Sequence, residues 1–198
     1  MSEEKHALRT QMKALREELA ARDPDAGETL ADKFPLKLLE RYGPTVATYL
    51  PIGSEIDPRP LMDKLTRAGA KLALPCVLQN GSMIYRHYKR GDPLEKAKFG
   101  LLEPFHEVPE VQPTLILTPL LAFDRQGNRL GYGKGHYDRA ISRLRANGRA
   151  FVCGLAFHGQ EVDAIPAEPH DIPLDWVMTE RGSIPLFMMR AMGQPDKD

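Results

Sequence analysis

The sequence is poor in cysteine and has no excess of charge of either sign. Its two cysteines, Cys76 and Cys153, are far apart in apolar, strand-like surroundings, so we expect buried reduced thiols rather than a disulfide or a metal pair. The 27 basic residues balance the 27 acidic ones. This balance leaves no global electrostatic reason to expect nucleic acid or an anionic membrane surface as the main partner.

Long hydrophobic runs are also missing. The apolar segment 115–123 is too short to span a bilayer and is broken by Pro119. The first residues, Met-Ser-Glu-Glu-Lys-His, are charged and lead into a helical pattern, which is not the pattern of a signal peptide. We therefore expect a cytoplasmic, monomeric protein that binds small molecules and neither nucleic acid nor membrane.

Two common kinds of catalytic site lack their sequence patterns. The chain contains no Gly-X-Ser-X-Gly, so a serine hydrolase is unsupported. A zinc site is not expected either, because the cysteines are distant and zinc-ligand spacing is absent among His87, His106, His158 and His170. With 198 residues, of which 42% are hydrophobic, the chain suits a single domain over residues 1–198.

Helical and strand patterns alternate along the chain. Apolar residues at helical spacing predict helices over 3–22, 26–41 (weakened at Pro35), 61–68 and the residues that follow 138. β-Branched and aromatic stretches predict strands over 45–50, 71–77, 82–88, 114–123, 151–157 and 172–178. Residues 92–111 are rich in charge and proline and are expected to be irregular. This order predicts an α/β sandwich with a mainly parallel sheet, in which ligands bind at the carboxyl ends of strands.

The most specific chemical signal is the segment 129–138, which reads Arg-Leu-Gly-Tyr-Gly-Lys-Gly-His-Tyr-Asp. Alternating glycines let backbone N–H groups approach phosphate oxygens, Lys134 adds a positive charge, and Asp138 can hold Mg²⁺. The segment lies between a predicted strand and the start of a helix, whose N-terminus favours anions. It matches neither the P-loop, since Gly135 follows Lys134, nor the dinucleotide-binding fingerprint. The pattern indicates a nucleotide triphosphate with its metal.

Simpler interpretations of these residues stay open at this point. The three glycines could form an ordinary flexible turn. Asp138 falls in the first turn of the predicted helix, where acidic residues are favoured whether or not they bind metal.

A longer pattern surrounds this segment and follows one order along the chain. The strongest part is Ala122-Phe123-Asp124 followed by residues 127–139; weaker parts are Lys5 with Arg9, 49–56, 99–104, 155–157 and 166–171. In these residues the chain resembles the 5-formyltetrahydrofolate cyclo-ligase family, also called methenyltetrahydrofolate synthetases. The resemblance implies a three-layer α/β/α sandwich of the NagB/RpiA/CoA-transferase-like type.

The resemblance also implies an activity: ATP- and Mg²⁺-dependent conversion of 5-formyltetrahydrofolate to 5,10-methenyltetrahydrofolate, with release of ADP and phosphate. The formyl group on N5 is an amide, and amide resonance makes its carbon a poor electrophile. In the implied mechanism the formyl oxygen attacks the γ-phosphate, N10 then adds to the activated carbon, and phosphate leaves. The protein contributes positioning and charge neutralisation.

Roles for individual residues follow from the same resemblance. Lys134 is the implied catalytic cation, placed against the transferred phosphoryl group, and Asp138 and Asp171 are the implied Mg²⁺ ligands. The implied folate contacts are Leu50, Glu55, Tyr132 and His136. The implied ATP-binding residues are Lys5, Arg9, Arg129, Leu130, Gly131, Tyr132, Gly133, Lys134, Gly135, His136 and Tyr137.

Several of these assignments have ordinary alternatives. Lys5 and Arg9 are one helical turn apart and could be solvated helix charges. Asp171 could be a solvated carboxylate in a proline-rich loop. His136 departs from the tyrosine usual in the family; it could make folate affinity depend on pH, or it could be a neutral packing substitution, which we favour.

Two other classes of function compete with the main interpretation. One is a non-catalytic ATP- or nucleic-acid-binding module on the same fold, because fold alone does not determine function. The other is a kinase or ATP-dependent ligase that uses the same phosphate loop on a non-folate substrate. Binding of reduced folates distinguishes the second from a cyclo-ligase.

Overall fold

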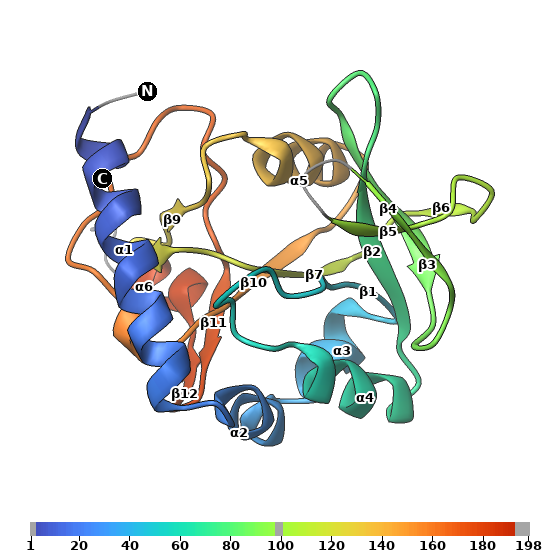
Figure 1. Cartoon of the computed structure of the whole chain (residues 1–198), viewed down its shortest axis with the longest axis horizontal. Helices are drawn as coiled ribbons and strands as arrows, with labels where there is room; N and C mark the ends of the chain where they lie inside the picture. Colours follow the sequence, from blue (N-terminus) through green and yellow to red (C-terminus); the bar gives the residue numbers. More distant parts are fainter. Residues whose placement is uncertain (1–2, 98–100, 193–198) are drawn as a thin grey trace.

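A large mixed sheet forms the centre of the molecule (Figure 1). The computed structural model describes residues 3–97 and 101–192. Five neighbouring strands run parallel, and the strands at both edges are added through antiparallel pairs. In the described residues the spatial order is β12 (Gly182–Ile184), β11 (Trp176–Thr179), β10 (Phe151–Leu155), β7 (Leu115–Thr118), β1 (Thr45–Ala47), β2 (Lys71–Val77), β3 (Met83–Tyr88) and β6 (Glu110–Val111).

Helices cover both faces of this sheet, which confirms the predicted three-layer sandwich. The first face carries α2 (Ala26–Lys33), α3 (Lys37–Tyr42) and α4 (Arg59–Arg67), and the opposite face carries α5 (His136–Ala146) and α6 (Leu186–Met192). Successive residues of each strand point to opposite faces. Val46 of β1 therefore packs with the first group of helices, and Ala47 packs with the second.

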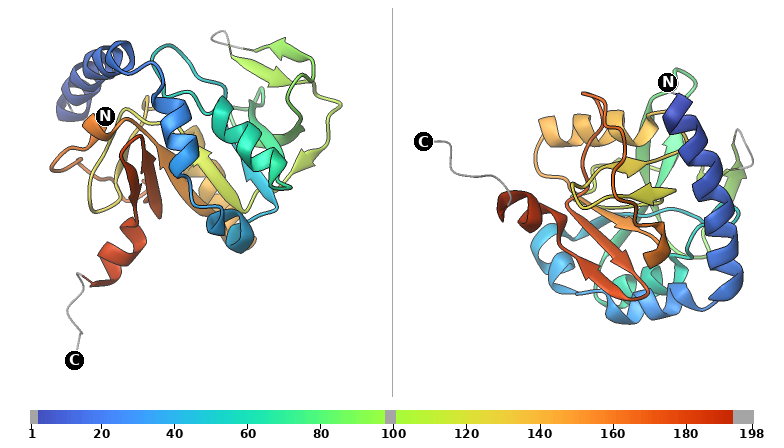
Figure 2. Two further views of the ribbon diagram at one scale, coloured as in Figure 1. Left: turned by 90° about the horizontal axis from the view of Figure 1, so that it is seen from below. Right: turned by 90° about the vertical axis from the view of Figure 1, so that its left-hand side faces the viewer.

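Helix α1 (Glu3–Arg22) packs outside these layers, against a small hairpin (Figures 1 and 2). The hairpin consists of β8 (Ala122–Phe123) and β9 (Arg129–Leu130), which pair antiparallel. Met12 of the helix is buried with Leu130 of the hairpin. The other buried residues on this helix face, Lys5 and Arg16, are cations rather than apolar side chains. Helix α1 therefore brings positive charge to the hairpin and the loop that follows it.

Most predicted elements are confirmed, and prolines explain two of the differences. The predicted helix 26–41 is interrupted at Phe34–Leu36, because Pro35 cannot continue a helix. The predicted strand 114–123 is divided by Pro119 into β7 and β8. Both cysteines are free and buried, as expected.

The prediction that residues 92–111 are irregular was wrong. They contain β4 (Leu94–Lys96) and β5 (Leu102–Pro104), which pair with each other, and also β6. Residues 99 and 100 of the matching segment 99–104 lie outside the described residues. Within the described parts of the chain, no helix is both long and apolar enough to cross a membrane.

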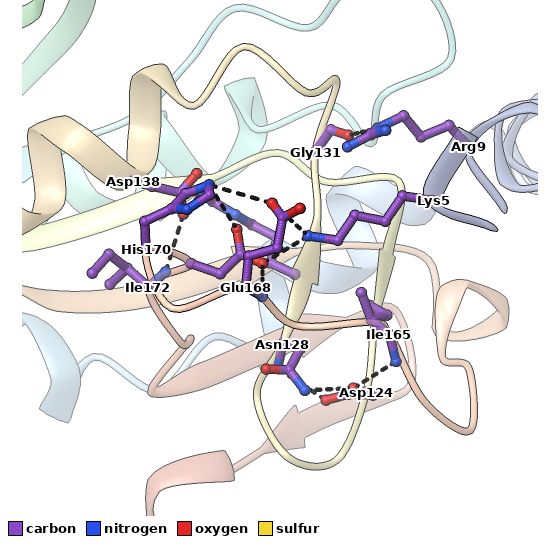
Figure 3. Close-up of polar contacts among 12 residues, drawn as sticks. Lys5, Arg9, Asp124, Asn128, Gly131, Asp138, Ile165, Glu168, His170 and Ile172 are labelled. Atoms are coloured by element: carbon purple, nitrogen blue, oxygen red, sulfur yellow. Dashed lines mark hydrogen bonds and ion pairs between the residues drawn. The ribbon is translucent and has the colours of Figure 1, made fainter. Parts of the chain in front are cut away.

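The buried carboxylate of Asp124 holds the turn between β8 and β9. One oxygen accepts a hydrogen bond from the backbone N–H of Asn128 at 2.9 Å, and the other accepts from the Asn128 side chain at 2.8 Å and from the Ile165 N–H at 2.9 Å. Asp124 is fully buried. It therefore fixes the hairpin that leads into the glycine loop and attaches the segment around Ile165 to it (Figure 3).

Replacing Asp124 with Ala is expected to lower the free energy of unfolding by about 2–4 kcal/mol, because buried donors lose their acceptor. Urea unfolding measures this change. The matched control is Asp25→Ala, since Asp25 is exposed before α2 and makes no side-chain capping bond; its effect should stay within about 0.5 kcal/mol. Equal effects of the two substitutions would contradict the role of Asp124.

Candidate active site

The glycine loop, residues 131–135, connects β9 to the first residue of α5. Gly133 (φ +87°) and Gly135 (φ +64°) have left-handed backbone conformations that favour glycine. Gly131 has no such conformation, and a Cβ built on it would meet open space. The left-handed backbone of the turn thus explains why residues 133 and 135 are glycines. The backbone of residue 131 does not itself require glycine, and the open surroundings of Gly131 suit the close approach of a ligand.

The carboxylate of Asp138 lies in the first turn of α5 and already has two partners. One of its oxygens accepts a hydrogen bond from Arg129 Nη2 at 2.9 Å and from the backbone N–H of Ile172 at 3.2 Å. Arg129 is itself held by Thr118, at the carboxyl end of β7, through an Nη1 to Oγ1 bond of 2.7 Å. Asp138 is therefore tied both to β9 and to the segment that contains Asp171.

Asp171 is paired with the N-terminal helix. Its Oδ2 accepts hydrogen bonds from Lys5 Nζ and from the backbone N–H of Glu168, both at 2.8 Å. Burial alone would raise the pKa of Asp171, but the Lys5 ammonium and the Glu168 N–H outweigh burial and hold that pKa below its usual range. Burial opposes the charge of Lys5 as well, yet Asp171 and Glu168 raise its pKa. The ion pair joins residues that lie 166 positions apart in the sequence.

Glu168 and His170 extend this cluster, and sequence reasoning did not identify them. Lys5 Nζ is 3.2 Å from Glu168 Oε2, which lies 3.3 Å from His170 Nε2. The potential ligand atoms of Glu168, His170 and Asp171 all lie within 4.8 Å of one another. Figure 3 shows Glu168 beside Lys5 and His170. Both additional residues are in the proline-rich segment that also carries Asp171, so their proximity in sequence is the signal that could have found them.

The two predicted metal ligands are connected through the backbone that follows Asp171. Ile172, whose N–H binds Asp138, directly follows Asp171. Asp138 does not belong to the cluster that Glu168, His170 and Asp171 form in the described residues. Each predicted metal ligand is paired with a predicted ATP-binding cation: Asp138 with Arg129, and Asp171 with Lys5.

Arg9 attaches helix α1 to the glycine loop. Its Nε donates a hydrogen bond of 2.8 Å to the carbonyl oxygen of Gly131. Its Nη1 is buried and has no hydrogen-bond partner among the described residues. A buried guanidinium donor without an acceptor is costly. Its position beside the glycine loop suits an anionic ligand such as phosphate.

The predicted folate-contacting residues Glu55 and Tyr132 are in direct contact. The Tyr132 hydroxyl donates to Glu55 Oε1 at 3.2 Å, and the Ile52 N–H donates to Glu55 Oε2 at 2.9 Å. Glu55 is 7% exposed, and burial raises the pKa of its carboxyl. Leu50 is partly buried against the neighbouring core. The segment 50–55, which follows β1, therefore meets the glycine loop at the carboxyl end of the parallel sheet.

Arg16 belongs to this contact and was missed by sequence reasoning. Its Nη2 donates to the Tyr132 hydroxyl at 2.7 Å. The signal was present in the helical spacing, because Lys5, Arg9, Met12 and Arg16 recur four, three and four residues apart on one face of α1. Arg16 is the fourth of these positions, and a cation on the same helix face as a buried methionine is a candidate for burial rather than an ordinary solvated charge.

The other predicted ATP-binding residues in and beside the glycine loop differ in how far their side chains are exposed. Lys134 is exposed. Leu130 is buried against α1, so only its backbone can face a ligand. Tyr137 packs against the core beneath α5 but is partly exposed. His136 Nδ1 lies 3.1 Å from the Gly81 carbonyl oxygen, and burial lowers the pKa of the ring. A neutral ring that packs against the β2–β3 turn fits the interpretation that we favoured for His136.

Comparisons with known proteins agree on one family. The model of the 5-formyltetrahydrofolate cyclo-ligase family matches residues 1–180. The 5-formyltetrahydrofolate cyclo-ligase of Haemophilus influenzae is 30% identical over 181 residues, which cover 87% of this chain and 96% of that protein. The enzyme of the same name from Mycolicibacterium smegmatis is 36% identical over 170 residues, covering 80% and 84%.

Solved structures extend this likeness to three dimensions. The NMR structure of Aquifex aeolicus 5,10-methenyltetrahydrofolate synthetase has a TM-score of 0.77 and 30% identity, and the match covers 92% of both chains. A 5,10-methenyltetrahydrofolate synthetase from Mycoplasma pneumoniae has a TM-score of 0.70 at 24% identity, covering 89% of this chain and 98% of that one, and supports the fold alone. Since the family model spans nearly the whole chain and two relatives match over most of their length, the chain belongs to the 5-formyltetrahydrofolate cyclo-ligase family.

Proposed function

We propose that the chain closes 5-formyltetrahydrofolate to 5,10-methenyltetrahydrofolate, with ATP consumed and ADP and phosphate released. Family membership supports the reaction class. The observation that carries the proposal is the convergence of charged groups on one glycine loop. Cations from α1 and β9 and carboxylates from α5 and the segment 168–171 meet there. This is the set of groups that a triphosphate and its metal require.

ATP is proposed to bind with its phosphates along the glycine loop. The backbone N–H groups of residues 131–136 and the N-terminus of the eleven-residue helix α5 favour an anion there. Arg9 Nη1, buried without a partner among the described residues, supplies a charged donor beside Gly131. Lys134 is exposed on the same loop and is proposed to stabilise charge on the transferred phosphoryl group.

The carboxylates fit Mg²⁺. This ion prefers oxygen ligands and is held in phosphate-binding sites by one or two carboxylates while keeping several waters. Asp138 and Asp171 would hold it, and Glu168 lies close enough to assist. A bound Mg²⁺ neutralises phosphate charge during transfer.

The ion pairs Lys5–Asp171 and Arg129–Asp138 place each proposed phosphate-binding cation beside a proposed metal ligand. Pairing of opposite charges lowers the cost of burying them. Lys5 and Arg129 are proposed to contact phosphate oxygens, and Asp171 and Asp138 to contact the metal that those oxygens also bind.

The folate is proposed to bind where residues 50–55 meet the glycine loop. Glu55 can accept hydrogen bonds from pterin N–H groups, Leu50 offers an apolar contact, and half-exposed Tyr132 can pack against a ring. Tyr132 belongs to the same loop that is proposed to hold the phosphates. The folate and the γ-phosphate are thus brought side by side.

The reaction then follows from this placement. A bond forms between the formyl oxygen and the γ-phosphorus, the bond from that phosphorus to its bridging oxygen breaks, and ADP leaves. N10 adds to the activated carbon and loses its proton; the carbon–oxygen bond breaks, and phosphate departs. The chain contributes mainly alignment and charge neutralisation, since phosphoryl transfer needs little covalent help from a protein.

The proposal is tested by mixing purified protein with Mg-ATP and 5-formyltetrahydrofolate and following the methenyl chromophore. Lys134→Ala should lower kcat about 10²–10³-fold, because it removes a preorganised charge at the transferred group, while the melting temperature changes little. Lys13→Ala, at an exposed position of α1, is the control and should keep kcat. Folded wild-type protein that produces no ATP-dependent chromophore would refute the function.

Metal binding is tested with Asp138→Asn. The substitution keeps the shape of the side chain but removes its charge, so the Mg²⁺ concentration for half-maximal activity should rise about tenfold or more. Asp163→Asn changes an exposed aspartate of the neighbouring segment 161–171 and serves as the control. Identical Mg²⁺ titrations of Asp138→Asn and the wild type would exclude Asp138 as a ligand.

The Lys5–Asp171 pair should make stability depend on pH in the absence of ligands. Lys5→Met is expected to lower the free energy of unfolding by about 1–3 kcal/mol near pH 7. The loss should shrink as pH falls through the lowered pKa of Asp171, and again as pH rises through the raised pKa of Lys5.

Unfolding curves of the wild type and Lys5→Met between acid and alkaline pH measure this difference. Lys13→Met, from the exposed side of the same helix, is the control and should follow the wild type throughout. A destabilisation by Lys5→Met that stays constant down to strongly acid pH would show that the ion pair is not its cause.

A further inference from the structure

Arg16 is almost fully buried, at 2% exposure, where three segments of the chain meet. Its Nε donates to Ser54 Oγ at 3.1 Å, its Nη1 to the carbonyl oxygen of Leu120 at 3.3 Å, and its Nη2 to the Tyr132 hydroxyl at 2.7 Å. The planar guanidinium can reach acceptors in several directions at once. One side chain of α1 thus connects the segment after β1, the segment after β7 and the glycine loop.

The contact with Tyr132 sets the direction of a short hydrogen-bond chain. Arg16 can only donate, so the Tyr132 oxygen accepts from it and uses its own hydrogen toward Glu55 Oε1 at 3.2 Å. Arg16 Nη1 is also 3.8 Å from the same Glu55 oxygen. A guanidinium, a phenol and a carboxylate therefore form one connected group. Burial raises the pKa of Tyr132, and the nearby charge of Glu55 raises it further, so its hydroxyl remains a donor.

Attachment of α1 to the protein does not account for this arrangement. Met12 already packs the helix against the hairpin, and Arg9 ties it to Gly131. The donors of Arg16 instead reach Ser54, Glu55 and Tyr132, where the folate is proposed to bind. A buried cation placed among substrate-contacting groups, rather than among packing residues, indicates a role in preparing them.

We propose that Arg16 is a positioning residue of the folate subsite, which holds the Tyr132 hydroxyl against the Glu55 carboxylate so that the glycine loop and residues 52–55 form one preformed surface. This inference rests on the proposed function for its ligand. Its physical content is preorganisation: Tyr132 is half exposed on a glycine-rich loop, and two buried side chains hold its hydroxyl, Arg16 at 2.7 Å and Glu55 at 3.2 Å. Removal of Arg16 leaves the longer of these two bonds. Arg16 touches neither substrate and acts through Tyr132 and Glu55.

The first test compares steady-state constants of Arg16→Met with the wild type. KM for 5-formyltetrahydrofolate should rise about tenfold or more, because binding must then order the subsite, whereas kcat should change less than about threefold. Arg22→Met, at an exposed position of the same helix, should keep both constants. A fall in kcat with unchanged folate KM would overturn the proposal.

A double-mutant cycle with Tyr132→Phe tests whether Arg16 acts through the phenol. Tyr132→Phe keeps the ring and removes only the oxygen that joins Arg16 to Glu55. In that background Arg16→Met should raise folate KM by less than about threefold, because coupled residues do not contribute independently. Arg16→Lys should restore folate KM only in part, since an ammonium keeps the charge but not the fork of donors. Additive effects of Arg16→Met and Tyr132→Phe would refute the coupling.

A measurement on the ligand-free protein separates this proposal from the proposed function. Arg16→Lys and Tyr132→Phe should shift the same backbone amide NMR signals of the glycine loop, whereas Arg22→Met should leave them in place. This readout holds even if the wild type forms no methenyl product, which would refute the proposed function alone. It also holds if Arg16→Met fails to fold. Glycine-loop signals that respond to Tyr132→Phe but not to Arg16→Lys would overturn the positioning role.

Discussion

Electrostatic docking of helix α1 is the interaction on which the candidate site depends. The face of α1 that meets the protein carries Lys5, Arg9 and Arg16 around a central Met12. Each cation binds a different part of the site: Asp171, the glycine loop, and the contact between Tyr132 and Glu55. Such a helix gains less from apolar burial than an ordinary amphipathic helix. Leu8, Leu15 and Leu19 are only partly buried against the core. Directional bonds add to this packing and place charge where phosphates and folate are proposed to bind.

The ion pairs Lys5–Asp171 and Arg129–Asp138 also explain how a protein with no net charge can carry the site proposed for a polyanion. Buried charges are costly unless they are paired, and here every predicted metal ligand and most predicted phosphate ligands have partners within the chain. Arg9 Nη1 is the exception among the described residues, because it is buried without an acceptor. Under the proposed function, ligands would bind to groups whose charges are already paired within the chain.

Much of this organisation could be predicted from sequence, and the exceptions have physical causes. The bounds of α1 and β2 follow from local periodicity, and the glycine loop follows from residue chemistry. The short strands β4, β5 and β6 could not be found that way, because pairing with distant residues stabilises them rather than local preference. Arg16 was missed because a charged residue in a charged helix is usually solvated; its burial depends on Tyr132, far along the chain. Glu168 and His170 lie close to Asp171 in sequence, but their roles depend on contacts that only the fold shows: Glu168 with Lys5, and His170 with Glu168.

The contact between Lys5 and Asp171 has a consequence for the time at which the protein becomes functional during its synthesis. Lys5 in helix α1 is synthesised 166 residues before Asp171. Domains fold as their chains emerge, and until the segment 168–171 has been made Lys5 cannot form this ion pair. A chain that has been synthesised only through the glycine loop therefore carries the proposed phosphate-binding loop without Asp171. The proposed nucleotide site is complete only after residues 168–171 have been added.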